Sequence, residues 1–222
     1  PKTYIVMASY YGGFDPLTEH LRALPNDSYA ILTHEQRGPE REVMGYSRVY
    51  NLLVNAAFSD PVCERVWLLG DDVLPEGDCL RETEKVLIAD PTIGAIFPVE
   101  AWRENGGPTI TITPFAGAKM PIEEALPQGP DQIRQIFAVF ACVCLTRFAW
   151  EKVGQLDESI GRGYAEDLDW GVRCWASGLR IINYRRAWYH HVRGGTYERL
   201  LKEGKFDAAE PHQANARVQA KF

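Results

Sequence analysis

Residues 163–173 read Gly-Tyr-Ala-Glu-Asp-Leu-Asp-Trp-Gly-Val-Arg, which places three carboxylates directly before a segment with helical spacing. The apolar residues that follow recur at i, i+4, i+7 and i+11. They predict one buried stripe of an amphipathic helix, formed by Leu168, Val172, Trp175 and Leu179. Gly178 predicts the end of this helix, because glycine adopts the left-handed conformation at little cost. The acidic residues then fall in the first turn, where the helix dipole favours negative charge.

These carboxylates have a structural and a functional interpretation. Acidic residues are common at helix starts, and Asp169 is spaced to pair with Arg173 one turn later. Two further features favour function: an acidic pair upstream, Asp71-Asp72, and a histidine pair downstream, His190-His191. We therefore expect folding to bring the two acidic sites together so that they flank one cation-binding crevice.

Composition limits the function classes. The chain has 222 residues, 45% hydrophobic and 24% charged, which is enough for one sizeable α/β core. The net charge of −6 and the lack of a long basic run argue against nonspecific binding to a phosphate backbone. No apolar run approaches the ~20 residues of a membrane span, and the start lacks a signal-peptide pattern. Five cysteines without a C-x-x-C pair favour a reducing, cytoplasmic setting.

The order of strands and helices predicts the fold. Apolar runs predict strands at 4–8, 29–33, 65–69, 93–97, 136–145 and 180–184, and helical spacing predicts helices after Asp15 and near 46–57, 80–88 and 148–153. This order is typical of an α/β fold, a single Rossmann-like domain over residues 1–196 with a central, mostly parallel sheet flanked by helices. Within the Gly- and Pro-rich residues 100–131, alternation at 109–113 predicts a small antiparallel excursion. Residues 197–222 are expected to form a peripheral helix or tail.

Polar residues follow two of the predicted strands. Ser9, Tyr10 and Tyr11 come directly after the first strand, and ligands of such sheets collect at the carboxyl ends of the strands. The alternative for the tyrosines is packing under the loop. Asp71-Asp72 follow the buried strand 65–69, where adjacent carboxylates are costly unless they bind a cation or hydrogen-bond donors. The alternative there is a turn, for which aspartate is also favoured.

In order, these features resemble family 2 glycosyltransferases with the GT-A fold. Strand 65–69 followed by Gly-Asp-Asp-Val-x-Pro is similar to the metal-binding D-x-D region, and Val-Gly-Gln-Leu-Asp-Glu at 153–158 is similar to the G-G-F-D-E turn. Residues 164–178 resemble the E-D-x-D-W-x-x-R…G segment, and His190-His191 falls where the family has a late histidine. The resemblance covers residues 3–196. It implies inverting transfer of a sugar from a nucleotide-sugar donor to an acceptor hydroxyl.

The resemblance also implies roles for individual residues. The catalytic pair would be Glu166 and Asp167, with Asp167 as general base. The Mn²⁺ or Mg²⁺ site would use Asp72, Asp71 and one of His190 and His191. Strand alternation points one histidine inward, and we favour His191. The donor would contact Ser9, Tyr10, Tyr11, Glu35 and Arg48, and the acceptor would contact Trp170, Asp169 and Arg193.

Two departures from the family pattern put the donor in question. Gly70 stands where the family has the first acidic residue of the metal motif, and the second strand ends in Thr-His-Glu at residues 33–35. The acceptor is open between a saccharide and a hydroxylated nucleic-acid base. Basic and aromatic residues that would suit a nucleic acid are Arg185, Arg186, Arg193, Trp188 and Trp102, although the net charge does not favour it.

The sequence leaves two alternative functions. A nucleotidyltransferase would attack phosphorus and usually has a basic, Gly-rich phosphate loop, but Gly12-Gly13 has no neighbouring Lys or Arg. A catalytically inactive sugar- or nucleotide-binding domain would be consistent with the loss of an acidic residue at Gly70. Nucleotide release in the presence of Mn²⁺ distinguishes an enzyme from such a domain.

Overall fold

The computed structural model describes residues 2–9, 17, 19, 21, 29–35, 44–104, 107–112, 118–121, 130–191 and 200–222. Its strands are β1 (Thr3–Ser9), β2 (Tyr29–Glu35), β3 (Arg65–Gly70), β4 (Val73–Pro75), β5 (Ile93–Glu104), β6 (Gly107–Ile112), β7 (Ala118–Pro121), β8 (Gln132–Gln135), β9 (Cys142–Thr146) and β10 (Arg180–His191). Its helices include α2 (Tyr46–Ser59), α3 (Cys79–Ala89), α5 (Arg147–Val153), α6 (Glu166–Ala176) and α8 (Glu210–Lys221). Within these ranges, no helix is long and apolar enough to cross a membrane.

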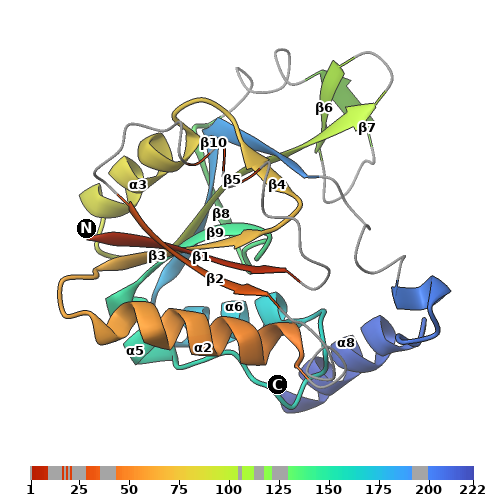
Figure 1. Cartoon of the computed structure of the whole chain (residues 1–222). Helices are drawn as coiled ribbons and strands as arrows, with labels where there is room; N and C mark the ends of the chain where they lie inside the picture. Colours follow the sequence, from red (N-terminus) through yellow and green to blue (C-terminus); the bar gives the residue numbers. More distant parts are fainter. Residues whose placement is uncertain are drawn as a thin grey trace.

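One mixed sheet organises the chain, with strand order β2-β1-β3-β9-β5-β10-β4. β1 pairs in parallel with β2 and β3, and β5 pairs in parallel with β10. β9 lies antiparallel between β3 and β5 and joins the two parallel groups. Figure 1 shows α2, α5 and α6 on one side of this sheet and α3 on the other. The α/β fold with a sheet between helices is therefore confirmed.

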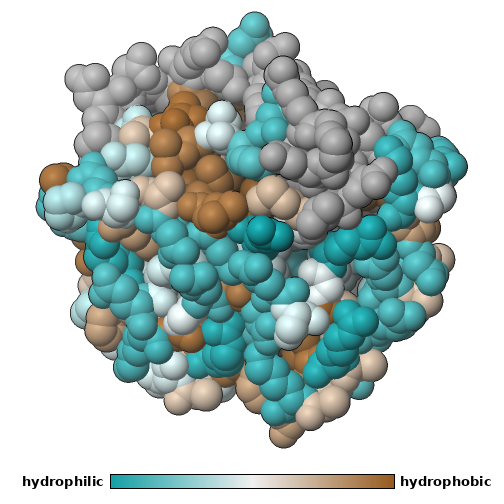
Figure 2. All heavy atoms as spheres, turned by 60° about the horizontal axis from the view of Figure 1, so that its bottom comes forward, coloured by the Kyte–Doolittle hydropathy of each residue, from teal (hydrophilic) through white to brown (hydrophobic). Residues whose placement is uncertain are grey.

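Strand residues alternate between two apolar cores. In β3, Val66 and Leu68 join the core under α2, α5 and α6, whereas Trp67 and Leu69 join the core on the α3 side. Because both faces are covered, residues 65–69 form a continuous apolar run rather than an alternating one. The molecular surface is correspondingly polar: the face in Figure 2 is mostly hydrophilic around one compact apolar area.

The antiparallel excursion is present as a hairpin. β6 pairs antiparallel with the end of β5, and β7 pairs antiparallel with β6. In Figure 1 this hairpin projects from the sheet, on the opposite side from α2. The predicted helix after Asp15 falls almost entirely outside the described residues.

The predicted strand 136–145 was too long. Only Cys142–Thr146 pairs with β3, while Ile136 and Phe137 are exposed. The last hydrogen bond to β3 is made by Ala141, and the residues before it leave the sheet. Ala141 O accepts a hydrogen bond from Gly70 N at 2.8 Å, and Phe140 O accepts one from the Tyr46 hydroxyl at 2.6 Å.

The predicted buried stripe of α6 was wrong in part, because Leu179 is buried but Trp175 is not. The side facing the sheet is formed by Trp170, Gly171 and Cys174, whereas Trp175 is 38% exposed. Trp170 donates its indole N–H to Gly154 O at 3.0 Å. The predicted end of the helix is correct, since α6 stops at Ala176 and Gly178 has a φ of +78°.

Gly171 allows residues 136–137 to pass close to the backbone of α6. A Cβ at this position would lie 2.5 Å from Ile136 O and 2.8 Å from Phe137 Cα, which is closer than side chains approach backbone. The residue is glycine because residues 136–137 cross the helix at van der Waals distance.

We predict that Gly171→Ala destabilises the protein, although alanine is intrinsically better than glycine in a helix by about 1 kcal/mol. The backbone clash should lower the free energy of unfolding by about 2–3 kcal/mol, and the melting temperature by roughly 5–10 °C. The matched control is Gly163→Ala, because a Cβ there meets nothing within 4 Å. An unchanged or higher melting temperature for Gly171→Ala would contradict this account.

Candidate functional site

A cavity of about 410 Å³ opens where the carboxyl ends of the strands meet the start of α6. Ser9 ends β1, Asp71 and Asp72 follow β3, and His191 ends β10. The first turn of α6, with Glu166 and Asp167, lines the same cavity. Folding thus brings Asp72 and Asp167, far apart in the sequence, to one cavity.

Asp71 and Asp72 occupy different surroundings within this cavity. Ser9 donates its hydroxyl to Asp71 Oδ2 at 2.5 Å, and burial raises the pKa of Asp71 despite this hydrogen bond. Asp72 turns back beside Gly70, where a Cβ would lie 2.8 Å from Asp72 Oδ1. A side chain at position 70 would therefore displace the Asp72 carboxylate. This contact accounts for the glycine at a position where the family that the sequence resembles has an acidic residue.

The two histidines face opposite directions, as strand alternation predicted. His191 lines the cavity, with Nε2 3.3 Å from Asp72 Oδ2 and Nδ1 2.6 Å from Glu100 Oε1. The His190 ring is not among the described side chains that line the cavity. Its Nε2 lies 3.1 Å from Glu76 Oε1. Burial by itself would lower the pKa of His191, but the hydrogen bonds that its ring donates to the Asp72 and Glu100 carboxylates raise it to about 9.

Asp72 and His191 are suited to hold a divalent cation. No group of three His, Cys, Asp or Glu side chains forms a metal cluster in the part of the chain that the structure describes. The pair nevertheless offers a carboxylate oxygen and an imidazole nitrogen, both of which Mn²⁺ accepts. The same negative charge that stabilises protonated His191 would stabilise a cation. Glu100 would orient the ring through Nδ1. The remaining ligands would come from water or a bound substrate.

Glu166 and Asp167 are held in an apolar turn. Ala165, the N-cap of α6, has a φ of +65°, and Tyr164 before it has a φ of +74°. Burial raises the pKa of Asp167 to about 6, and burial together with the neighbouring Asp167 raises that of Glu166 to about 8. Near neutral pH the two carboxyls therefore share one proton. The ionised carboxylate of the pair is able to accept a proton.

Several predicted contact residues lie elsewhere. Asp169 has no exposed surface and pairs with Arg173 and Lys221, so the structural interpretation of this residue is the one observed. Trp170 is buried in the core. Glu35 and the exposed Arg48 lie outside the described lining. Tyr10, Tyr11 and Arg193 lie outside the described residues.

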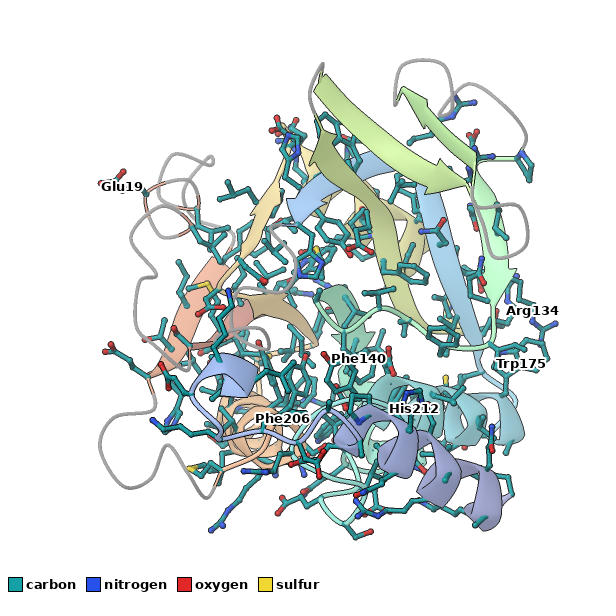
Figure 3. All side chains as sticks on the ribbon, turned by 90° about the vertical axis from the view of Figure 1, so that its right-hand side faces the viewer. Glu19, Arg134, Phe140, Trp175, Phe206 and His212 are labelled. Atoms are coloured by element: carbon teal, nitrogen blue, oxygen red, sulfur yellow. The ribbon has the colours of Figure 1, made fainter. Side chains whose placement is uncertain are left out.

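Other lining residues were not predicted from the sequence. Phe140 and Phe206, both labelled in Figure 3, reach the cavity from segments far apart in the chain. Tyr46 and Tyr50 lie on α2. Both line the cavity, and the Tyr50 hydroxyl donates to Leu69 O at 2.7 Å. No local pattern distinguishes these aromatic residues from core residues.

We predict that Glu166→Gln stabilises the protein at alkaline pH. The folded-state pKa of about 8 lies above the usual value of 4.5, so folding disfavours the ionised carboxyl. Glu166 therefore reduces the free energy of unfolding progressively as the pH rises from about 4.5 to 8. Glutamine cannot ionise, so the variant should gain about 1–3 kcal/mol at pH 8.5, and little at pH 4.5.

Thermal unfolding of both proteins at pH 4.5 and 8.5 tests this. The control is Glu151→Gln, an exposed glutamate on α5. A gain of equal size at both pH values, or no gain, would show that the Glu166 carboxyl is not destabilised by burial.

No protein-family model matches the chain, and no curated protein matches it in sequence. Its structure is similar to that of GalNAc-T7 solved with UDP, GalNAc and Mn²⁺, with a TM-score of 0.55 and 12% identity over 86% of this chain. The match spans 43% of the length of GalNAc-T7.

Two further solved structures are similar. A197 from STIV has a TM-score of 0.54 and 12% identity over 87% of each chain. The mannosyltransferase PcManGT from Pyrobaculum calidifontis, in complex with GDP-Man and Mn²⁺, has a TM-score of 0.53 and 15% identity over 98% of this chain and 70% of its own. Membership of family 2 stays a prediction. Together with the sheet described above, these similarities show that the chain has the GT-A-like glycosyltransferase fold.

Proposed function

We propose that this protein is an inverting, metal-dependent glycosyltransferase that moves a sugar from a nucleotide-sugar donor to an acceptor hydroxyl. The observation that carries the proposal is that the Asp72–His191 pair and Asp167, far apart in the sequence, line one cavity. The neighbours support glycosyl transfer in general, since GalNAc-T7 was solved with UDP and Mn²⁺ and PcManGT with GDP-Man and Mn²⁺.

The donor side of the cavity is the edge formed by the strand ends. Asp72 and His191 would hold Mn²⁺ or Mg²⁺ there, and Ser9 with Asp71 lies beside them, next to the end of β1. A cation bound by this pair would supply charge stabilisation to the leaving diphosphate, more in the transition state than in the ground state.

The acceptor side is the first turn of α6. The acceptor hydroxyl attacks the anomeric carbon as the bond from that carbon to the diphosphate breaks, and its proton passes to the Asp167 carboxylate. In the proposed reaction, Asp167 and a cation held by Asp72 and His191 act on opposite sides of the anomeric carbon, so that attack comes from the side away from the leaving group. Single displacement of this kind inverts the anomeric centre. The apolar lining limits water, which would otherwise hydrolyse the donor.

A catalytically inactive binding domain is the second candidate. Gly70 is the feature that would favour it, but the close approach of Asp72 to Gly70 gives that glycine a role within an intact site. A nucleotidyltransferase is a further alternative within the same fold. Identification of the product, as free nucleoside diphosphate or as pyrophosphate, distinguishes it from a glycosyltransferase.

We predict that Asp167→Asn lowers the rate of transfer about 10²- to 10⁴-fold, because an amide cannot accept the hydroxyl proton. Donor affinity should not change, since the proposed partner of Asp167 is the acceptor hydroxyl. Nucleotide release with a panel of UDP- and GDP-sugars and Mn²⁺ measures the rate, and calorimetry measures donor affinity. Asp78→Asn, at the exposed start of α3, is the control. Equal turnover of Asp167→Asn and the parent would eliminate Asp167 as the base.

We predict that Asp72→Ala weakens binding of UDP or GDP in the presence of Mn²⁺ by roughly 10- to 100-fold. Binding without Mn²⁺ should stay the same, because the loss is of a cation ligand. The matched control is Glu76→Ala, which removes the equivalent carboxylate from His190 outside the described lining. If calorimetry gives the same Mn²⁺ dependence for Asp72→Ala and the parent, Asp72 is not a metal ligand.

A further inference from the structure

The C-terminal segment supplies part of the cavity wall. Leu200, Lys205 and Phe206 line the cavity, although the sequence suggested a peripheral helix or tail for residues 197–222. The Phe206 ring lies 6.3 Å from the Tyr164 ring, at an interplanar angle of 56°. The two rings therefore form an aromatic corner rather than a parallel stack. Tyr164 comes shortly before Asp167, so this corner belongs to the acceptor side.

Tyr164 is held in an unfavourable conformation. Its φ of +74° and that of +65° at Ala165 lie in the left-handed region, which side chains other than glycine adopt at a cost. Its ring is nevertheless 40% exposed, so core burial does not account for the aromatic residue. Backbone strain that persists at the edge of a cavity is typical of ligand-binding positions.

The loop that carries Tyr164 is held by α8 and, through the hydrogen bond from Arg162 to Lys205 O, by the segment that carries Phe206. The Arg162 guanidinium binds the Glu210 carboxylate, and Arg217 donates to Ile160 O. An apolar cluster joins the loop before α6 to α8 through Ile160, Ala165, Ala214 and Val218. Figure 1 shows α8 beside the end of the molecule that carries α6. The corner is thus present before any ligand binds.

The charges around the corner are paired. The Arg162 guanidinium lies 5.3 Å from the centre of the Phe206 ring and is bound to Glu210. Lys205 Nζ lies 3.2 Å from Glu203 Oε2. Glu166 and Asp167 contribute negative charge to the same wall. Arg162 and Lys205 line the cavity, but each is already paired with a glutamate, so a phosphorylated or otherwise anionic acceptor would have to displace one of these ion pairs to gain a cation.

We infer that Tyr164 and Phe206 form the acceptor subsite, and that it selects an uncharged, hydroxylated ring of the saccharide class. The apolar face of the ring packs against the two aromatic side chains while a hydroxyl reaches Asp167. This inference rests on the proposed glycosyl transfer for the direction of the reaction. The inference narrows the class of acceptor, because a sugar phosphate and a nucleic-acid strand are both negatively charged.

The test uses the full chain with Mn²⁺ and the donor that gives most nucleotide release. The acceptors are p-nitrophenyl pyranosides, hexose 6-phosphates and a short oligonucleotide containing 5-hydroxymethylcytosine. We expect transfer to a neutral pyranoside. Phe206→Ala should raise the acceptor KM about 3- to 10-fold, which is more than it raises the donor KM. Phe206→Tyr should keep the parent value, and Phe148→Ala, an exposed phenylalanine outside the described lining, is the matched control.

Tyr164→Gly distinguishes an effect on acceptor binding from an effect on protein stability. Glycine relieves the left-handed backbone, so the melting temperature should not fall, yet loss of the ring should raise the acceptor KM about 3- to 10-fold. The inference is overturned if Phe206→Ala and Tyr164→Gly shift the acceptor KM no more than Phe148→Ala does. Preferred transfer to the hexose phosphates or to the oligonucleotide would overturn it as well.

Binding measured without turnover distinguishes this inference from the proposed function. Saturation-transfer NMR of the same pyranosides, with UDP or GDP and Mn²⁺ present, should show contact in the parent and its loss in Phe206→Ala. Contact without any glycosyl transfer would contradict the proposed function and leave the subsite standing. Transfer to an acceptor that Phe206→Ala does not affect would contradict the subsite and leave the proposed function standing.

Discussion

A buried ion cluster around Asp169 supports the arrangement on which the site depends. Asp169 has no exposed surface, and a fully buried carboxylate requires partners. Arg173 binds it at 2.7 Å and also donates to Val153 O and Gln155 O, which fixes α6 against the end of α5. Lys221 binds it at 2.6 Å from the last turn of α8. The first turn of α6, with Glu166 and Asp167, is therefore held by α5 and α8 together.

The second constraint is the shared edge of the sheet. β1, β3 and β10 end near one another, and each contributes a polar residue to the cavity: Ser9, Asp72 and His191. The apolar strands beneath are covered on both faces, so these polar groups gather where the strands stop. The strand ends and the first turn of α6 both line the cavity, and each contributes carboxylates. Burial of that charge costs stability, and the raised pKa values of Glu166 and Asp167 express the cost.

Much of the fold and part of the site were predictable because they depend on local patterns. The apolar run 65–69 and the residues after it defined β3 and the Asp71-Asp72 turn. Alternation along β10 selected His191 over His190, because successive strand residues point to opposite faces. Glycine at 178 marked the end of α6, since its φ of +78° suits no other residue type as well. Glu100 was not predicted, because its contact with His191 arises from the register between β5 and β10.

The sequence by itself determined the elements, their order, and the acidic and histidine residues at their ends, because periodicity and capping act over a few residues. Only the tertiary structure decided which face of α6 is buried, since Trp170 and Gly171 pack against residues 136–137 and Gly154 rather than against their own neighbours. It also decided that the C-terminal segment closes the cavity. That closure depends on pairs such as Arg162–Glu210 and Tyr164–Phe206, and no local pattern encodes contacts between residues so far apart in the chain.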